Sequence, residues 1–244
     1  MKYIFNIYLS LLITISYAQN GAIPPVIRAQ NTLDDISRSG VGANTLLYGL
    51  PMRPGTLIGD FYLDNKWNRS TLLLYAGDKL LEGYLTRFDL KEQHLEIKLD
   101  KSIKILDIRK IRSIVWRDSL TNKISYYVNA GDFVSHETKL LGLLEVLVDG
   151  KLPLMKHTSV AIKRADYNVA LDVGSKDDRV LKKEILYFSR ESSLYEIKNK
   201  KSLGSAFLDR QEQVDVFIRN NKLSFSNERD LITLFEYYNS LEEK

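Results

Sequence analysis

Residues 94–100, His94-Leu95-Glu96-Ile97-Lys98-Leu99-Asp100, alternate strictly between polar and apolar side chains. Successive side chains of an extended strand point to opposite faces, so this stretch predicts a β-strand with one buried and one wetted face. Similar short apolar runs lie around it at Leu57–Leu63, Leu72–Tyr75, Tyr84–Leu90, Ile103–Leu106, Ile111–Trp116 and Ile124–Val128. Their spacing of roughly 10 to 14 residues leaves no room for crossover helices and predicts a meandering antiparallel sheet, curled or closed.

A second β unit is expected from about residue 140. Glu145–Val148 and Lys151–Leu154 flank Asp149-Gly150, and an Asp-Gly pair between two apolar runs is a strong hairpin signal. A further hairpin is expected across Arg190–Ser193, and the polar stretch Asp166–Arg179 is expected to form a loop.

The apolar spacing becomes helical after residue 200. Asp209 with Glu212 three positions later resembles a capping box at the start of one helix. Asn227 is expected to cap a longer helix, whose apolar stripe consists of Leu231, Leu234, Phe235, Tyr238 and Leu241. The predicted fold is therefore α+β: an antiparallel, curled β-sheet region over 56–139, and then a second β unit with C-terminal amphipathic helices over 140–244.

The first eighteen residues resemble an export signal. Lys2 precedes an apolar core that runs from Tyr3 to Ile15, and Ser16-Tyr17-Ala18 ends it with small residues where a signal peptidase reads them. We expect cleavage between Ala18 and Gln19, and export to the periplasm or the outer membrane. The Pro- and Gly-rich stretch 19–55 is expected to be an extended arm, because four of the five prolines fall within it.

Composition narrows the function classes. Cysteine is absent, which excludes disulfides, thiol nucleophiles and cysteine metal sites. Removal of the signal takes away Lys2 alone, so the mature net charge is 34 minus 31, or +3. This small, dispersed excess is not the pattern of a nucleic-acid-binding protein, and no nucleic-acid partner is expected.

Few residues are arranged for chemistry. The three histidines, His94, His136 and His157, form no short-spaced metal pair, so no metal site is expected. Gly174-Ser175-Lys176 lacks the strand-turn-helix setting of a nucleophile elbow. No phosphate-binding glycine motif is present, and no catalytic residue or cofactor is assigned. Two further candidates are interpreted as ordinary surface, namely a calcium loop of Asp172, Asp177 and Asp178 and a basic cluster of Lys198, Lys200 and Lys201.

The aromatic residues leave two interpretations open. At strand positions they are more often core or cross-strand pairs than the lining of a ligand cleft. The set is Phe61, Tyr62, Trp67, Tyr84, Phe88, Trp116, Tyr126 and Tyr127.

Several stretches together resemble a group of exported Bacteroidetes proteins that have no assigned function. They are Gly59–Leu63 followed by Trp67, Leu85–Asp89, Leu144–Lys151, Asn221–Leu223 and Tyr237–Asn239. The resemblance implies a Gram-negative envelope setting and brings no catalytic residues. Asp118-Ser119-Leu120 also resembles the Asp-Ser/Thr-apolar O-glycosylation signal of Bacteroidetes, which makes Ser119 a candidate acceptor.

Two functions remain as hypotheses. The first is a non-catalytic envelope protein that binds a partner protein or ligand through a β surface, with a peripheral membrane contact left open. The alternative is a carboxylate-based envelope hydrolase whose site is assembled only in three dimensions. A concave pocket with perturbed titratable groups would favour the hydrolase, and a flat aromatic patch would favour the binding protein.

Overall fold

A computed structural model describes residues 55–135, 139–168, 171–207 and 209–241. The expected cleavage site at Ala18 and Gln19, the arm up to residue 54 and His136 lie outside the described residues. The described chain belongs to one compact unit, Pro54–Lys244.

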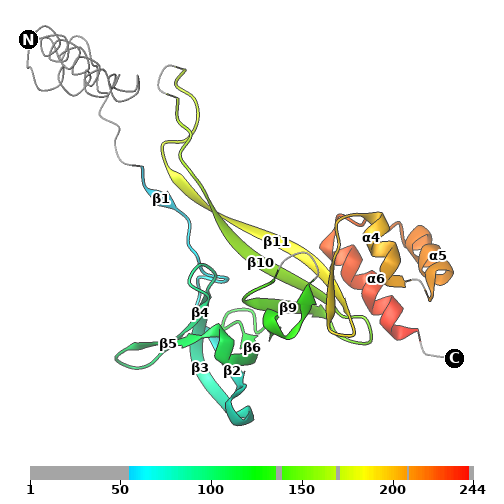
Figure 1. Cartoon of the computed structure of the whole chain (residues 1–244), viewed down its shortest axis with the longest axis horizontal. Coiled ribbons are helices and arrows are strands. Elements are labelled where there is room, and N and C mark those ends of the chain that lie inside the picture. Colours follow the sequence, from blue (N-terminus) through cyan, green and yellow to red (C-terminus); the bar gives the residue numbers. More distant parts are fainter. Residues whose placement is uncertain (1–54, 136–138, 169–170, 208, 242–244) are drawn as a thin grey trace, which may run out of the picture. The chain divides into compact units, whose positions relative to one another are not determined.

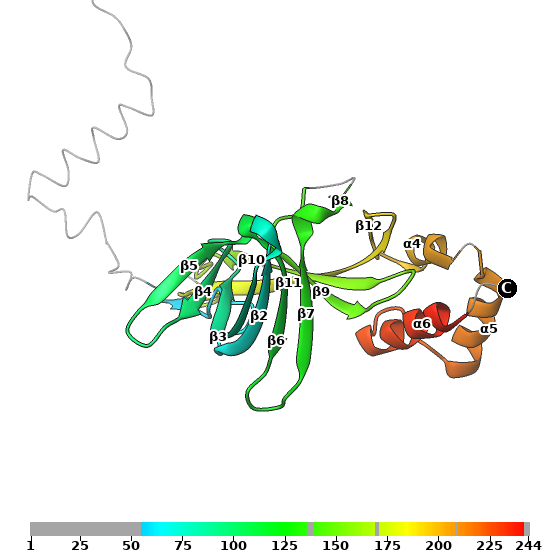
Figure 2. The ribbon, with the colours of Figure 1, turned by 90° about the horizontal axis from the view of Figure 1, so that it is seen from below.

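Most of the described structure is a single large sheet that does not close on itself (Figures 1 and 2). Among the described residues the strand order is β5-β4-β3-β2-β6-β7-β9-β10-β11-β12-β8, and β1 pairs with β11 beside this path. The strands are β1 (Leu57–Ile58), β2 (Asn68–Leu74), β3 (Leu80–Asp89), β4 (His94–Lys98), β5 (Ile103–Asp107), β6 (Ile111–Arg117), β7 (Ile124–Asn129), β8 (Val134–Ser135), β9 (Leu143–Val148), β10 (Leu154–Lys163), β11 (Asp178–Arg190) and β12 (Ser193–Glu196).

The alternating stretch that begins at His94 is β4, as predicted. Leu95 is buried on the core face, whereas Glu96 points to the other face and pairs across the sheet with Arg87 of β3. The expected turns lie at 76–78, 119–122, 149–150 and 190–193, each between two neighbouring antiparallel strands. Local turn chemistry therefore accounts for most of the strand order.

The expectation of an antiparallel sheet holds in part, because the sheet is mixed in two places. β1 runs parallel to β11, and β12 runs parallel to β8. Each of these pairs joins segments far apart in the sequence, so no hairpin turn dictates their direction. The sheet also continues past residue 140, because β7 pairs with β9 from Tyr126–Val146 to Asn129–Leu143.

Among the described residues, three α-helices follow the sheet: α4 (Lys200–Gly204), α5 (Gln211–Asn221) and α6 (Glu228–Ser240). Asn227 caps α6 as predicted, since its side chain accepts a hydrogen bond from Arg229 N at 2.9 Å. The predicted capping box is wrong, because the N-cap of α5 is Arg210, without a side-chain cap. Asp209 instead accepts hydrogen bonds from the Tyr238 hydroxyl, at 2.8 and 2.9 Å to its two oxygens.

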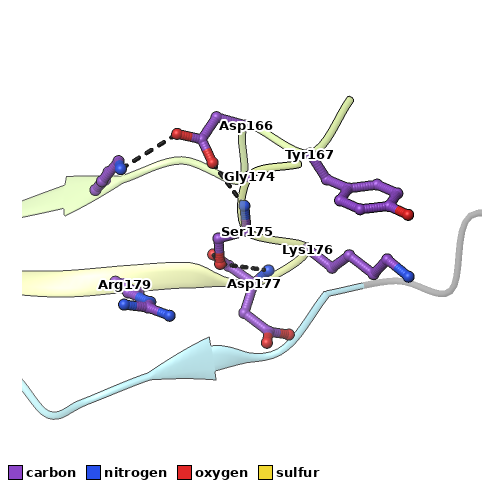
Figure 3. Close-up of a pocket in the computed structure, with 8 residues that line it drawn as sticks. Asp166, Tyr167, Gly174, Ser175, Lys176, Asp177 and Arg179 are labelled. Atoms are coloured by element: carbon purple, nitrogen blue, oxygen red, sulfur yellow. Dashed lines mark hydrogen bonds and ion pairs between the residues drawn. The ribbon is translucent and has the colours of Figure 1, made fainter. Parts of the chain in front are cut away.

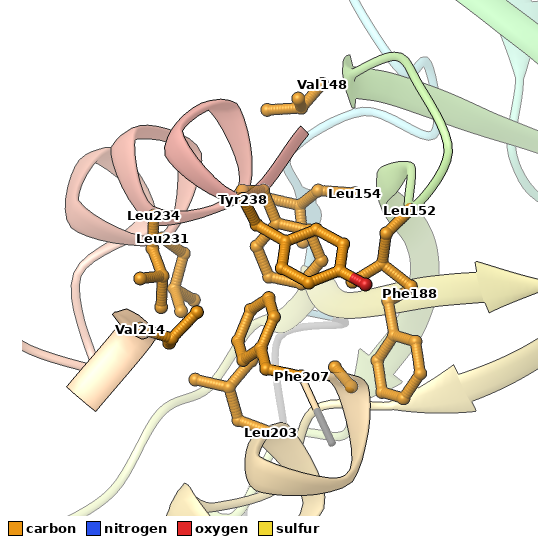
Figure 4. Packing of buried hydrophobic residues seen from close by; sticks show 12 residues of the cluster. Val148, Leu152, Leu154, Phe188, Leu203, Phe207, Val214, Leu231, Leu234 and Tyr238 are labelled. Carbon is orange, nitrogen blue, oxygen red and sulfur yellow. The ribbon is translucent and has the colours of Figure 1, made fainter. Parts of the chain in front are cut away.

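The buried apolar side chains of the described part of the chain form three clusters. One lies between the helices and the β9–β11 strands, as Figure 4 shows, and contains Phe207, Leu234, Phe235 and Tyr238. A second lies on the inner face of β2–β7 around Leu72, Phe88 and Trp116. The third, smaller cluster surrounds Met155 and Tyr187. The helices therefore cover the later strands, and the meander has its own core.

Candidate functional site

Arg87 lies at the centre of a cluster on the outer face of β3 and β4. Its guanidinium carbon lies 3.8 Å from the centre of the Tyr62 ring and 4.5 Å from that of Trp67. Arg87 Nε donates to Glu96 Oε2 at 2.7 Å, and the Tyr62 hydroxyl donates to Glu96 Oε1 at 3.1 Å. The cation thus lies over two rings and is neutralised by one carboxylate.

This cluster holds the chain segment before β2 against the sheet. Burial, followed by the hydrogen bond to Glu96, raises the pKa of Tyr62 above its ordinary value, so the hydroxyl stays a donor. Backbone bonds from Leu63 N to Phe88 O and from Leu90 N to Phe61 O, at 2.9 and 2.8 Å, fasten the same segment. We therefore interpret the Arg87 cluster as a structural contact that holds this segment on the sheet. Its rings and charged groups already contact one another.

The predicted aromatic set is divided by the structure. Phe88, Trp116 and Tyr127 are buried core residues. Tyr84 and Tyr126 are exposed but lie on different strands. Phe61 lies near a cation, with Lys91 Nζ at 5.2 Å from its ring centre. Tyr62, Trp67 and Phe61 each already face the cation of Arg87 or Lys91. The described rings therefore form no group that lines an open cleft.

The two described histidines lie apart. His94 is half-buried, and its Nε2 lies 3.9 Å from Glu96 Oε1. His157 is buried, with its Nε2 at 2.9 Å from Leu141 O. The described chain brings together no group of three His, Asp or Glu side chains that could hold a metal ion.

β5 forms one edge of the sheet, at the opposite end of the strand order from β8. Leu99 N donates to Ser102 O at 2.8 Å. From this pair on, hydrogen-bonded and non-hydrogen-bonded residue pairs alternate along the β4–β5 hairpin. Lys104 and Leu106 therefore bond to β4, whereas the backbone N–H and C=O groups of Ile103 and Ile105 point away from it. The residues Ile103 and Ile105 are 52% and 67% exposed. This edge combines unpaired backbone groups with exposed apolar side chains.

A hollow of about 520 Å³ lies at the end of the β10–β11 hairpin (Figure 3). Its carboxylates are already engaged: Asp166 accepts from Ser175 N at 2.8 Å and lies 3.2 Å from Lys163 Nζ, and Asp177 accepts from Thr56 N at 2.9 Å. The backbone hydrogen bond from Ser175, followed by Lys163, lowers the pKa of Asp166. The full lining is Lys163, Asp166, Tyr167, Gly174, Ser175, Lys176, Asp177 and Arg179.

The loop residues considered for catalysis or calcium are not arranged for either. The Ser175 hydroxyl donates to Asp177 O at 3.0 Å, within its own loop. Asp172 accepts from the Tyr167 hydroxyl, Asp177 accepts from Thr56 N, and Asp178 accepts from Arg164 at 2.6 Å. The three aspartates that were interpreted as ordinary surface thus bind separate partners. Gly174 has a φ of +95°, and a Cβ there would lie 2.4 Å from Asp166 O, so the loop requires glycine.

The remaining candidates lie on the surface. Ser119 is exposed in the turn between β6 and β7, where Asp118 accepts from Leu120 N at 2.7 Å. Lys198 Nζ lies 3.8 Å from Glu196 Oε2. The side chains of Lys200 and Lys201 lie outside the described part of the chain. Sequence reasoning missed the β5 edge, because the position of a strand within a sheet depends on pairing and not on its own residues.

None of the helices in the described part of the chain is long and apolar enough to cross a membrane. Comparison with known proteins identifies no relative, because no protein family, no curated protein and no solved structure matches this chain.

Proposed function

We propose that this protein is exported to the cell envelope and there binds an extended segment of a partner protein along β5, without catalysing a reaction. The observation that carries the proposal is the β5 edge, where Ile103 and Ile105 present both unpaired backbone groups and exposed side chains. An added strand would pair with these groups, and its side chains would contact the two isoleucines.

The charge at this edge favours an acidic partner segment. Lys98, Lys101 and Lys104 are exposed along the β4–β5 hairpin. Asp107, at the end of β5, is held by Arg109, whose Nε lies 3.0 Å from both carboxylate oxygens. Asp100, exposed in the turn of the same hairpin, offsets one of the three lysines, so the free charge beside the edge is positive on balance. An acidic, alternately apolar segment complements this charge.

The rest of the fold supports a binding surface on the outside of a curled sheet. Val160 of β10 packs against the cluster that β2–β7 build on their inner face, which brings the later strands over the meander. Helix α6 buries Leu231, Leu234 and Phe235 and exposes Glu236, as an amphipathic cover would. The inner face of the sheet and the apolar face of α6 are thus buried in the core. The outer face of the sheet and the β5 edge remain accessible to a partner.

The hydrolase alternative has less support. A general acid at neutral pH needs a carboxyl group whose pKa is raised. In the hollow of the β10–β11 hairpin the pKa of Asp166 is lowered, and Asp177 is tied to Thr56. Glu96 is bound by Arg87 and Tyr62. These carboxylates are arranged as structural acceptors.

Two variants at one position test the β5 proposal. Ile105→Ala removes the exposed side chain and keeps the outward N–H, whereas Ile105→Pro also removes that donor at an edge position that tolerates proline. The parent should enrich an envelope protein in affinity purification with quantitative mass spectrometry. Ile105→Ala should retain less of it, and Ile105→Pro should lose it.

Leu120→Ala is the matched control, because Leu120 is another exposed apolar residue, in the turn between β6 and β7. All variants should unfold at the parent's urea midpoint. Equal recovery of the same proteins by the parent and by Ile105→Pro would show that β5 is not the binding edge.

Export has its own test. Ala18→Arg should block processing, because the signal peptidase accepts only small side chains at this position. The mature N-terminus is read by mass spectrometry of the protein from envelope fractions. Parent protein that retains Met1 in the envelope would contradict cleavage after Ala18.

A further inference from the structure

A row of side chains crosses six neighbouring strands of the meander. In the register, one residue of each strand lies opposite the next, from β7 across β6, β2, β3 and β4 to β5 (Figure 2). Residues paired across neighbouring strands share a face of the sheet, so these side chains point to the same side. We call them the transverse row: Ile124, Arg117, Arg69, Leu85, Lys98 and Ile103.

The transverse row lies on the outer face, away from the meander core. Leu85 precedes Arg87 by two residues, and Lys98 follows Glu96 by two. Residues two apart along a strand share a face, so the row lies beside the Arg87 cluster. Thr86, between Leu85 and Arg87, is buried on the opposite side. Leu85 is half-buried, and the other five residues of the row are exposed.

The row consists of three cations and three apolar residues, without an acid. Arg69 and Arg117 lie directly opposite each other, and like charges in this arrangement destabilise a strand pair. Within the described chain, no acidic side chain pairs with either arginine or with Lys98. Lys98 Nζ lies 5.7 Å from the centre of the Trp67 ring, a contact that leaves its charge in place. An anion bound between the two arginines would relieve their repulsion.

The acids near the row reduce this positive charge without cancelling it. Glu96 and Asp118 are already engaged, by Arg87 at 2.7 Å and by Lys66 at 3.7 Å. In the part of the chain that the structure describes, two exposed acids and one further exposed lysine accompany the row, namely Glu82, Asp100 and Lys101. Four cations against two acids leave an excess of two positive charges on this face.

We propose that the transverse row binds a linear acidic polysaccharide that runs across the strands. Arg69 and Arg117, about 5 Å apart across one strand spacing, would hold its anionic groups, and Lys98 would meet another about 10 Å from Arg69. The guanidinium fork matches a carboxylate with two parallel hydrogen bonds. Leu85 and Ile124 would contact the C–H surfaces of the sugar rings. The whole row spans about 24 Å, which accommodates several sugar units.

The position of the row favours a polysaccharide over an acidic polypeptide. An extended peptide is captured where a strand has unpaired backbone groups, which is at an edge of a sheet. The strands β7, β6, β2, β3 and β4 are paired on both sides, so their outer face offers side chains alone. A polysaccharide has no amide groups that require partners, and its hydroxyls stay hydrated. The row thus does not depend on the segment proposed to pair along β5.

The test is calorimetric titration of the purified mature protein with polygalacturonate, which carries one carboxylate on each sugar. Neutral dextran and polyglutamate serve as comparisons. The parent should bind polygalacturonate, bind polyglutamate more weakly and not bind dextran. Arg69→Gln should weaken binding about fivefold, and Arg69→Gln with Arg117→Gln by a further factor of similar size. Arg69→Lys should weaken it less than Arg69→Gln, because lysine keeps the charge but lacks the fork.

Lys110→Gln is the matched control, because Lys110 is an exposed cation just before β6 and its loss changes the net charge equally. It should leave the affinity unchanged. Arg69→Gln should unfold at a urea concentration no lower than the parent's, because the substitution removes a repulsion between opposite residues. Ile105→Pro should keep its affinity for polygalacturonate, which separates this site from β5.

Three outcomes would overturn the proposal. Equal affinities of the double arginine variant and Lys110→Gln would show that the binding is not located at the row. Equal affinity of the parent for polyglutamate and polygalacturonate would assign the face to an acidic polypeptide. Loss of polygalacturonate binding in Ile105→Pro, with the arginine variants unaffected, would place the polysaccharide at the β5 edge.

Discussion

Arg87 joins three parts of the chain that are separate in the sequence. Tyr62 and Trp67 precede β2, Arg87 lies on β3, and Glu96 lies on β4. The guanidinium suits this position because it is planar and stays charged, so it stacks on both rings and still donates to the carboxylate. A lysine at this position would reach the carboxylate but would not stack in the same way.

Arg87→Ala should destabilise the protein by about 2 kcal/mol, because it removes two ring contacts and leaves the half-buried Glu96 without its cation. Urea unfolding measures the change. Arg112→Ala is the control, since Arg112 pairs with Asp78 at 3.1 Å on the exposed surface, and its effect should stay within about 0.5 kcal/mol. Equal effects of the two variants would show that the ring stack contributes nothing.

Tyr238 links α6 to Asp209, two residues before α5, and should make stability depend on alkaline pH. Burial, followed by the hydrogen bond to Asp209, raises the pKa of Tyr238 from 10.0 to about 12. Because the folded protein holds this proton more tightly than the unfolded chain does, the contribution of Tyr238 is complete below about pH 10. It is lost as the pH rises from about 10 to about 12.

Tyr238→Phe should therefore flatten part of the decline in unfolding free energy over this pH range, measured by urea titration at successive pH values. Near neutral pH the variant should be less stable than the parent by about 1 kcal/mol, because the hydrogen bond to Asp209 is lost. Tyr126→Phe, at an exposed position, serves as the control. A parent and a Tyr238→Phe variant with parallel pH curves would contradict the assigned role.

At the scale of elements, α6 is a cover for the later strands. Asn239, near its end, fastens it to the β9–β10 hairpin: Leu152 N donates to its Oδ1 at 2.9 Å, and its Nδ2 donates to Leu152 O at 3.0 Å. Phe235 is fully buried and packs edge-on against Phe207, with ring centres 5.2 Å apart. Apolar burial and side-chain hydrogen bonds therefore both hold this helix to the sheet.

Phe235→Ala should destabilise the fold by about 3 to 5 kcal/mol, as expected for the loss of a fully buried aromatic ring. The measurement is the urea midpoint together with the slope of the transition. Val216→Ala, on the exposed side of α5, should change stability little. If Phe235→Ala kept the parent's midpoint but lost partner binding, the apolar stripe of α6 would be an interaction surface and not a core.

At the scale of the whole molecule, the β7–β9 pairing makes one sheet of the meander and the later strands. Both tryptophans lie in the meander region, Trp67 before β2 and Trp116 on β6, whereas the helices lie at the other end of the described chain. Tryptophan fluorescence and the helical circular dichroism signal thus report on different ends of one sheet.

These two signals should change with the same urea midpoint, because strand pairing across residue 140 couples the two ends. Substitutions at the two ends of the sheet serve as a control. Arg87→Ala and Phe235→Ala should each shift the urea midpoints of the fluorescence and circular dichroism signals by the same amount. Two separated transitions in the parent would show that the regions before and after residue 140 unfold as independent units.

The residues themselves determined the local structure. The alternation from His94 to Lys98, the Asp149-Gly150 turn and the Asn227 cap act over a few neighbouring residues, and each was recognisable without the fold. The absence of cysteine is likewise a property of the sequence alone. The Asp209 cap failed because Tyr238, far along the chain, offered the carboxylate a hydrogen bond that no local pattern records.

Only the tertiary structure decided which strand became the edge and which side chains came together. In the sequence, Ile105 does not differ from other strand residues. Its exposure follows from the position of β5 at the end of the strand order. The end of the β10–β11 hairpin likewise depends on the pairing of Ile58 with Arg179, and of Arg179 with Lys163. Periodicity specifies which face of a strand is apolar, but long-range pairing selects its neighbours, and those neighbours decide what remains open for binding.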